Sequence, residues 1–443
     1  MFEKNTKVKV YDAMCGQGKT EKIIEDVSKM TTPALYISPL LSEVDRVCGF
    51  KLNEDGSLIK DDDGNIMYKE DHPLKDKNFV APTRKWLRNK SDVIKQLIID
   101  GENIAATHTL FSMMDSECIS ILKSSNYTLI IDEDLCVWKR FQLKGFRNDD
   151  YGESVEYAGE KSKNTTDAVV HNFINNNIIT VGDLGALSWN EDKFSAFEKD
   201  PVWYEIKSYC DSQQLLLIDN KVVFWELPPS LLRAFKDIIV ATYMFKASYF
   251  ATYLTYNNIP FEIETFGKTP KDIKHLVNLV EGKINNVGDS ESALSYTHLC
   301  ADKRSDRVEV KSRLNKNLLN FFKNICKSKP EERLWTTYKG AIEGIQGRYG
   351  TSWLAFNTKA TNDYIGCRDV AYLCNNYPNV MLLKIVAKRQ EGAFDKDLWA
   401  LSTMLQFIFR SRLRKGEPIN LYIPSSRMRS LFKRWLDGEF END

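Results

Sequence analysis

One stretch near the start of the chain decides its fold: Val8-Lys9-Val10-Tyr11-Asp12-Ala13-Met14-Cys15-Gly16-Gln17-Gly18-Lys19-Thr20. The β-branched run at its beginning predicts a short strand. The next residues, Glu21-Lys22-Ile23-Ile24-Glu25-Asp26-Val27, predict a helix with one apolar face. A strand and a helix joined by a glycine-containing turn that ends in Gly-Lys-Thr form the pattern of a phosphate-binding loop. The chain is therefore expected to begin with an α/β unit.

The residue types in this loop match the chemistry of holding a nucleoside triphosphate. Gly16 and Gly18 allow backbone N–H groups to close around phosphate oxygens, where a Cβ atom would obstruct them. Lys19 is expected to reach the β- and γ-phosphates, and Thr20 to ligate Mg²⁺. The helix that begins near Lys19 points the positive end of its dipole at the same anion. The predicted cofactors are ATP and Mg²⁺, and the predicted nucleotide-binding residues of the loop are Ala13, Gly16, Gln17, Gly18, Lys19 and Thr20.

A second signal is an apolar run that ends in three acidic residues, Tyr127-Thr128-Leu129-Ile130-Ile131-Asp132-Glu133-Asp134. The run predicts a buried strand with carboxylates at its tip. In phosphate-loop enzymes an acidic group at this place holds Mg²⁺, and a neighbouring group orients the attacking water. We assign the metal role to Asp132 and the water-orienting role to Glu133.

Composition places the chain among ordinary globular proteins. Hydrophobic residues make up 43% and charged residues 28% of the 443 positions, a length sufficient for two or three domains. The 61 basic and 61 acidic side chains cancel, so the overall charge gives no hint of nucleic acid. None of the nine cysteines forms a Cys-x-x-Cys pair, which argues against a zinc ribbon. No apolar run approaches the roughly 20 residues of a bilayer span, so no membrane partner and a cytoplasmic location are expected.

Strand and helix patterns divide the chain into two α/β halves. Residues 1–250 are predicted to form the first domain, with further strands at Ala34–Ser38 and Asp237–Met244 and an insertion over about 140–235. Residues 251–443 are predicted to form the second domain, which has no phosphate-binding loop of its own. There the patterns predict strands at Leu334–Tyr338, Ser352–Asn357 and Ile419–Pro424.

The last motif is Leu401-Ser402-Thr403-Met404-Leu405-Gln406-Phe407-Ile408-Phe409-Arg410-Ser411-Arg412-Leu413-Arg414. Helical spacing would place Gln406, Arg410 and Arg414 on one face, with Arg412 roughly opposite. A phosphate-loop ATPase needs a cation at the γ-phosphate in the transition state, and an arginine from a second domain is the usual device. The predicted catalytic residues are therefore Lys19, Glu133, Gln406, Arg410 and Arg414, while Arg412 is predicted to bind the nucleotide and competes with the other two arginines for the finger role.

Together these motifs resemble the helicase-type ATPases of superfamily 2, the DEAD/DEAH-like class, in a divergent phage-encoded form. The resemblance is carried by Ala13–Thr20, Asp132–Asp134, Ala241-Thr242 and Gln406–Arg414, which occur in the family's order over nearly the whole chain. Some positions depart from the family pattern. The loop begins with Ala13 instead of glycine, the acidic box continues with Leu135, and Phe409 replaces the glycine before the arginine. Because only a few residues precede the first strand, we expect the family's upstream adenine-reading glutamine motif to be absent, so the resemblance leaves the nucleotide base open.

The resemblance implies two RecA-like domains with ATP in the cleft between them and nucleic acid across the tops of both. It implies that nucleic acid is held through its backbone phosphates by polar loop residues, and we expect single-stranded or branched DNA more than RNA, although the sequence does not decide between them. Partners in replication or recombination, in the cytoplasm of a bacterial host, would follow from a phage origin. The residues expected to contact nucleic acid are Ser38, Pro39, Thr107, His108, Thr109, Thr358, Lys359 and Asn362.

Two other classes of protein remain open at this point. A small-molecule kinase would explain the phosphate-binding loop, but it needs neither a second α/β half nor a late arginine motif. A packaging or assembly ATPase would use the same hydrolysis without translocation. Stimulation of ATP turnover by nucleic acid separates the helicase class from both.

Overall fold

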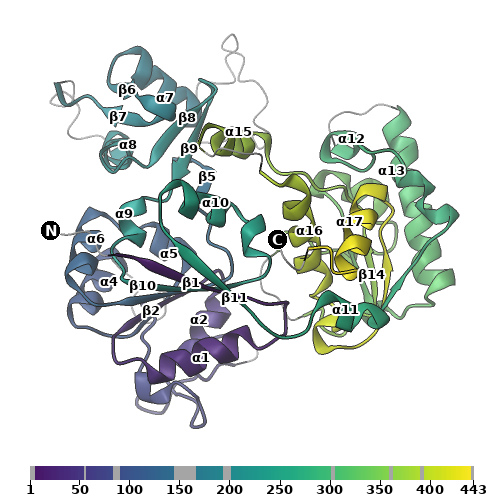
Figure 1. The fold of residues 1–443 in the computed structure, drawn as a ribbon, viewed down its shortest axis with the longest axis horizontal. Helices are drawn as coiled ribbons and strands as arrows, with labels where there is room; N and C mark the ends of the chain where they lie inside the picture. Colours follow the sequence, from purple (N-terminus) through teal and green to yellow (C-terminus); the bar gives the residue numbers. More distant parts are fainter. Residues whose placement is uncertain are drawn as a thin grey trace.

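Two parallel β-sheets, one in each half of the chain, form the centres of two α/β domains (Figure 1). The computed structural model describes residues 5–53, 56–82, 90–143, 166–192, 201–300, 305–358, 363–389 and 394–440. The predicted α/β class, with two tandem parallel-sheet domains and an insertion in the first, is confirmed.

The first sheet has six parallel strands in the order β11-β1-β10-β4-β2-β3. Its central strands are apolar runs because helices cover both faces of the sheet: α1 lies on one face and α10 on the other (Figure 1). The strands are β1 (Lys7–Asp12), β2 (Ala34–Ser38), β3 (Ile104–Thr107), β4 (Thr128–Asp132), β10 (Asp237–Thr242) and β11 (Phe261–Thr265). The helices around them are α1 (Lys19–Lys29), α2 (Leu41–Cys48), α4 (Lys90–Ile99), α5 (His108–Ser112), α6 (Ser116–Ser124), α9 (Pro229–Leu232) and α10 (Tyr249–Tyr256).

The second sheet has four parallel strands in the order β12-β15-β14-β13. It has its own core, in which Trp335, Tyr372, Tyr422 and Trp435 are almost completely buried. The strands are β12 (Val277–Leu279), β13 (Arg333–Thr336), β14 (Asp369–Tyr372) and β15 (Ile419–Tyr422). The helices are α11 (Pro270–Ile273), α12 (Tyr296–Cys300), α13 (Ser305–Asn320), α14 (Ile342–Ile345), α16 (Lys396–Ile408) and α17 (Ser426–Leu436).

The insertion in the first domain forms a separate antiparallel layer. Its three-stranded sheet has the order β5-β9-β8, and two further strands, β6 and β7, make a small hairpin. The elements are β5 (Trp138–Arg140), α7 (Thr166–Asn175), β6 (Ile179–Val181), β7 (Leu187–Trp189), α8 (Pro201–Asp211), β8 (Leu215–Ile218) and β9 (Val222–Glu226). The apolar faces of these elements continue the core of the first domain, so the insertion is packed onto it rather than attached by a linker alone.

One helix of the second half, α15 (Val380–Arg389), packs on this insertion (Figure 1). Ile385 and Val386 are buried within the core of the first domain. Arg389 forms an ion pair with Glu226, and both side chains are only 6–7% exposed. Just beyond the helix, Phe394 stacks on Tyr249 with ring centroids 5.0 Å apart. The two halves of the chain are therefore joined far from the phosphate-binding loop.

Sheet membership corrects the predicted domain boundary near residue 250. β11 pairs with β1 and is the edge strand of the first sheet, so the first domain continues at least to Thr265. The second sheet begins with β12 at Val277. A parallel edge pairing joins residues that are distant in sequence, and local pattern carries no signal for it.

Two predicted elements of the second half are wrong. No strand forms at Ser352–Asn357, where a single bridge joins Trp353 to Trp335 and the apolar side chains pack as a loop. The helix predicted over 401–414 ends at Ile408. The Ser411 hydroxyl accepts a hydrogen bond from the N–H of Leu413 and starts a separate 3₁₀ turn, because serine competes for backbone groups that would continue a helix. Among the described residues, no helix is long and apolar enough to cross a membrane.

Candidate nucleotide-binding site

The loop between β1 and α1 has the backbone geometry of a phosphate cradle. Gly16 and Gly18 have φ angles of 82° and 81°, the left-handed region that favours glycine. Gly18 is the N-cap of α1 and caps it with no side-chain hydrogen bond, so the first N–H groups of the helix face the loop. The Lys19 ammonium donates to the carbonyl oxygens of Ala13 and Met14, at 2.5 and 3.2 Å. A cation and several N–H donors therefore converge on one loop, as anion binding requires.

The acidic residues lie at the end of β4, which is separated from β1 by β10 alone. The Ser38 hydroxyl donates to Asp132 Oδ2 at 3.1 Å. Burial raises the pKa of Asp132 to about 6, and the neighbouring carboxylates of Glu133 and Glu43 add to this shift. Glu133 has a φ of 66°, rare for a residue with a side chain, and its N–H donates to Ala241 O at 2.9 Å.

The second domain brings Arg410 to the same place. Its side chain is buried, with 8% exposure, and burial lowers the pKa of the guanidinium. Glu133 and Cys15 are near enough to oppose that shift electrostatically. One guanidinium nitrogen of Arg410 donates to the carbonyl oxygen of Thr358. A buried cation from one domain thus lies within electrostatic range of an acidic group of the other.

Arg414 reaches the loop through its backbone. A Cβ atom on Gly16 would lie 2.6 Å from the Arg414 carbonyl oxygen, so the 3₁₀ turn Arg412–Lys415 packs directly on the loop. Arg412 points elsewhere, because its Nε donates to Pro418 O at 2.6 Å. Gln406 is half-buried on α16. The broken helix therefore still places Arg410 and Arg414 near the loop, although not by the predicted helical spacing.

Asp12 had no predicted role, and Gln17 was predicted to bind the nucleotide. The structure shows a further contact for each of them. The Asp12 carboxylate accepts from the N–H groups of Met244 and Phe245, both at 2.7 Å, and so ties the end of β1 to the turn after β10. The Gln17 side-chain oxygen accepts from Lys268 N at 3.1 Å, which ties the loop to the segment between the domains. The presence of an acidic residue directly before the loop was the only feature of the sequence that pointed to the contact made by Asp12.

A cavity of about 520 Å³ lies beside the beginning of the loop, where the two domains meet. Its walls come from the end of β1, the turn after β10, the segment that follows β11, and the second domain. The residues that close it from the second domain are Leu398, Trp435 and Phe440. The indole N–H of Trp435 donates to the Tyr243 hydroxyl at 2.8 Å across this junction.

The residues predicted to contact nucleic acid differ in how far they are exposed to solvent. Ser38 is fully buried and bonds Asp132, so its hydroxyl positions the acidic group instead of facing solvent. β3 ends at Thr107, which caps α5, and His108 is buried within that helix, while Thr109 is exposed. Pro39 and Thr358 are half-buried. Lys359 and Asn362 lie outside the described residues.

The residues present fit a magnesium-bound nucleoside triphosphate. The left-handed backbone at Gly16 and Gly18 forms a turn of the kind whose N–H groups bind phosphate, and Mg²⁺ in such sites is held by one or two carboxylates together with substrate phosphates. Thr20 and Asp132 would supply the protein ligands. No group of three or more His, Cys, Asp or Glu side chains suited to a metal occurs in the described part of the chain.

Fold and loop define a two-domain α/β protein with a phosphate-binding-loop geometry. The chain belongs to the YonV family. It is 30% identical over 459 residues to the SPbeta prophage-derived protein YonV of Bacillus subtilis (strain 168), a match that covers 98% of this chain and 99% of that protein. Residues 271–436 match the YonV C-terminal Rossmann-like domain, which agrees with the second sheet. The solved structure of S. tokodaii Xpd4 is similar over 97% of this chain and 93% of that one, with 9% identity and a TM-score of 0.42, a level that supports no argument about activity.

Proposed function

We propose that this protein is a helicase-type ATPase that hydrolyses ATP between its two domains and uses the cycle to move along or remodel DNA. One observation carries the proposal: a buried arginine of the second domain, Arg410, lies within electrostatic range of Cys15 in the loop and of Glu133 after β4, both in the first domain. A cation supplied by a second domain can stabilise the charge of phosphoryl transfer. It also makes hydrolysis depend on the relative position of the two domains.

Each residue has a distinct role in this proposal. The loop N–H groups and Lys19 hold the phosphates, and Thr20 and Asp132 would hold Mg²⁺, which supplies charge neutralisation when bound. Glu133 orients the attacking water. Arg410 stabilises the charge that develops on the γ-phosphate, and Arg414 holds the turn of the second domain against Gly16.

The test is ATP turnover measured with and without single-stranded DNA, duplex DNA and RNA. We expect DNA to stimulate turnover. Lys19→Ala should abolish it, since removal of one essential donor to a developing oxyanion costs about 100- to 1,000-fold. Glu133→Gln should bind ATP normally but fail to turn it over. Hydrolysis that no nucleic acid changes would contradict the helicase class and favour a packaging or assembly ATPase, while phosphate transfer to a small molecule would favour a kinase.

A further inference from the structure

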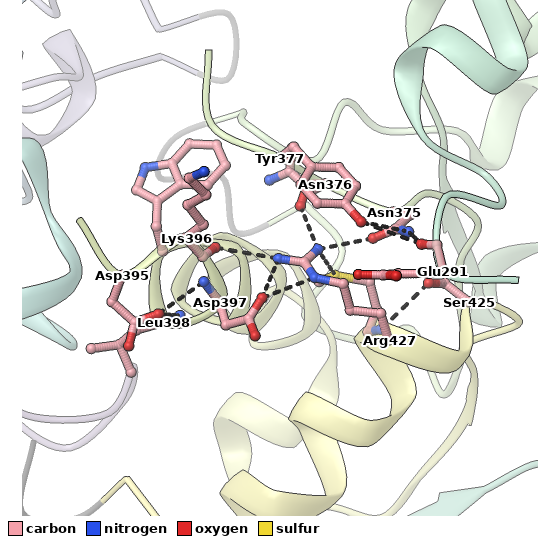
Figure 2. A network of polar contacts seen from close by, with 12 residues as sticks. Glu291, Asn375, Asn376, Tyr377, Asp395, Lys396, Asp397, Leu398, Ser425 and Arg427 are labelled. Carbon is pink, nitrogen blue, oxygen red and sulfur yellow. Dashed lines mark hydrogen bonds and ion pairs between the residues drawn. The ribbon is translucent and has the colours of Figure 1, made fainter. Parts of the chain in front are cut away.

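At the carboxyl edge of the second sheet, one face of a tyrosine ring lies against an arginine, and the ring remains partly exposed to solvent. Tyr377 follows β14 and is 39% exposed. The Arg427 guanidinium lies 4.2 Å from the ring centroid (Figure 2). The Tyr377 hydroxyl donates to Glu291 O at 3.3 Å. The ring is therefore fixed on one face and at its tip.

The support behind the ring is an extended hydrogen-bond network (Figure 2). Arg427 on α17 donates to Asp397 Oδ1 at 2.6 and 2.9 Å and to Asn375 Oδ1 at 2.9 Å. Asn375 is fully buried and donates in turn to Glu291 O and Ala293 O. The network joins the strand end, the start of α16 and α17, so Tyr377 has little freedom to move. Such pre-organisation lowers the entropy lost when a ligand packs on the ring.

The surroundings of Tyr377 suit a nucleobase better than a folded protein partner. In the part of the chain that the structure describes, Val380 (63% exposed) is the only other exposed large apolar side chain after Ile325, so the sequence around Tyr377 contributes little apolar surface. The next strand of the sheet, β13, ends near Lys339, which is exposed. Lys339 follows Tyr338, whose hydroxyl donates to Asn375 O at 2.7 Å. An aromatic ring and a lysine at neighbouring strand ends match the base and the phosphate of a single strand.

We propose that Tyr377 is a stacking platform for a base of single-stranded DNA, held in place by Arg427. The inference rests on the proposed function, since it gives that function a contact with its nucleic acid. Stacking of one base on an aromatic side chain is sequence-tolerant, because every base has a π-face. Tyr377 is then the binding group and Arg427 is a positioning residue.

The experiment compares two probes of equal length, a 12-nucleotide oligothymidylate and an abasic strand with the same backbone, by fluorescence anisotropy on the full chain. We expect Tyr377→Ala and Tyr377→Leu to weaken oligothymidylate binding about tenfold. Tyr377→Phe should bind within about twofold of wild type, because the ring is retained. None of the variants should change binding of the abasic strand. Tyr68→Ala, which removes another exposed tyrosine (53% exposed) from the first domain, is the matched control and should bind as wild type does.

The outcomes separate this inference from the proposed function. If wild type binds oligothymidylate and Tyr377→Leu binds it equally well, the platform is wrong and the helicase proposal stands. Equal losses on both probes would also overturn stacking, because a base is then not needed. If wild type binds neither probe nor any other nucleic acid, the proposed function fails and the inference fails with it.

Discussion

The two halves of the chain meet at the phosphate-binding loop and at α15, and these two contacts differ in chemistry. At the phosphate-binding loop, the contact consists of a backbone carbonyl against Gly16, the buried Arg410 beside Glu133, and Met14 packed into the second core. A cavity of about 520 Å³ lies next to it. At α15, by contrast, Arg389 and Glu226 form a buried ion pair within a continuous apolar core.

This difference indicates which contact can separate. A buried charge that loses its partner is costly, so the α15 contact resists opening. The loop contact lies beside a cavity, and in the proposed function its charged groups also bind the nucleotide. A cycle of cleft opening would therefore move the loop side while α15 remains on the insertion. Four substitutions test the comparison.

The largest effect is expected for Arg410→Ala. Removal of a finger arginine should lower ATP turnover by about 10³- to 10⁵-fold with little change in nucleotide affinity. Single-turnover hydrolysis and equilibrium binding measure the two quantities separately. Arg412→Ala is the control, because Arg412 bonds Pro418 O and not the loop. A matching loss in Arg412→Ala or Arg414→Ala alone would show that the finger is assigned to the wrong arginine.

At the other contact, Arg389→Ala should leave Glu226 buried without its cation. The expected loss is about 3–5 kcal/mol in the free energy of unfolding, measured by urea denaturation. Arg389 also lies 5.0 Å from the Tyr256 ring centroid, and that contact is lost too. Lys384→Ala is the control: it breaks the exposed pair with Asp219, which should contribute about 1 kcal/mol or less. Equal effects of the two substitutions would remove the distinction between the contacts.

Asp132→Asn tests whether the buried Asp132 carboxylate, on the loop side, lowers the stability of the fold. Because burial raises the pKa of Asp132 to about 6 from 3.8, the folded protein holds this proton more tightly than the unfolded chain. The carboxylate therefore destabilises the fold above pH 6, and this penalty disappears as the pH falls towards 4. Asp132→Asn should raise the free energy of unfolding at pH 8 by at most about 3 kcal/mol and change it little at pH 4. Because the side chain is partly exposed, solvent screening makes the gain at pH 8 smaller than this limit. A pH-independent effect would contradict the burial argument.

From backbone strain alone, the smallest effect is expected for Gly16→Ala. Alanine at a left-handed φ costs about 1–2 kcal/mol, and here its Cβ would also lie 2.6 Å from the Arg414 carbonyl oxygen. We expect the turn of the second domain to shift away, which a pair of fluorophores across the cleft would detect. Gly64→Ala is the matched control, since Gly64 has a φ of 84° and no heavy atom within 4 Å of the added Cβ. An identical fluorescence change in both variants would show that backbone strain alone is responsible.

Much of the first sheet was predictable because its strands are continuous apolar runs. β1, β2, β4 and β10 fall where the patterns place them, and α1 follows the loop as expected. The errors lie where an apolar run packs without pairing, as at Ser352–Asn357, or where a serine ends a helix early, as after Ile408. In each case a local pattern competes with a tertiary contact or a side-chain hydrogen bond that it does not encode.

The loop Ala13–Thr20 and the acidic strand end were determined by the sequence alone, because their chemistry needs particular residue types at neighbouring positions. Only the tertiary structure decided that Arg410 lies within electrostatic range of Glu133, that β11 is the edge strand of the first sheet, and that α15 packs on the insertion. Each of these joins segments far apart in the chain. Their pairing depends on the shape and burial of the whole fold, which no local period of strand or helix encodes.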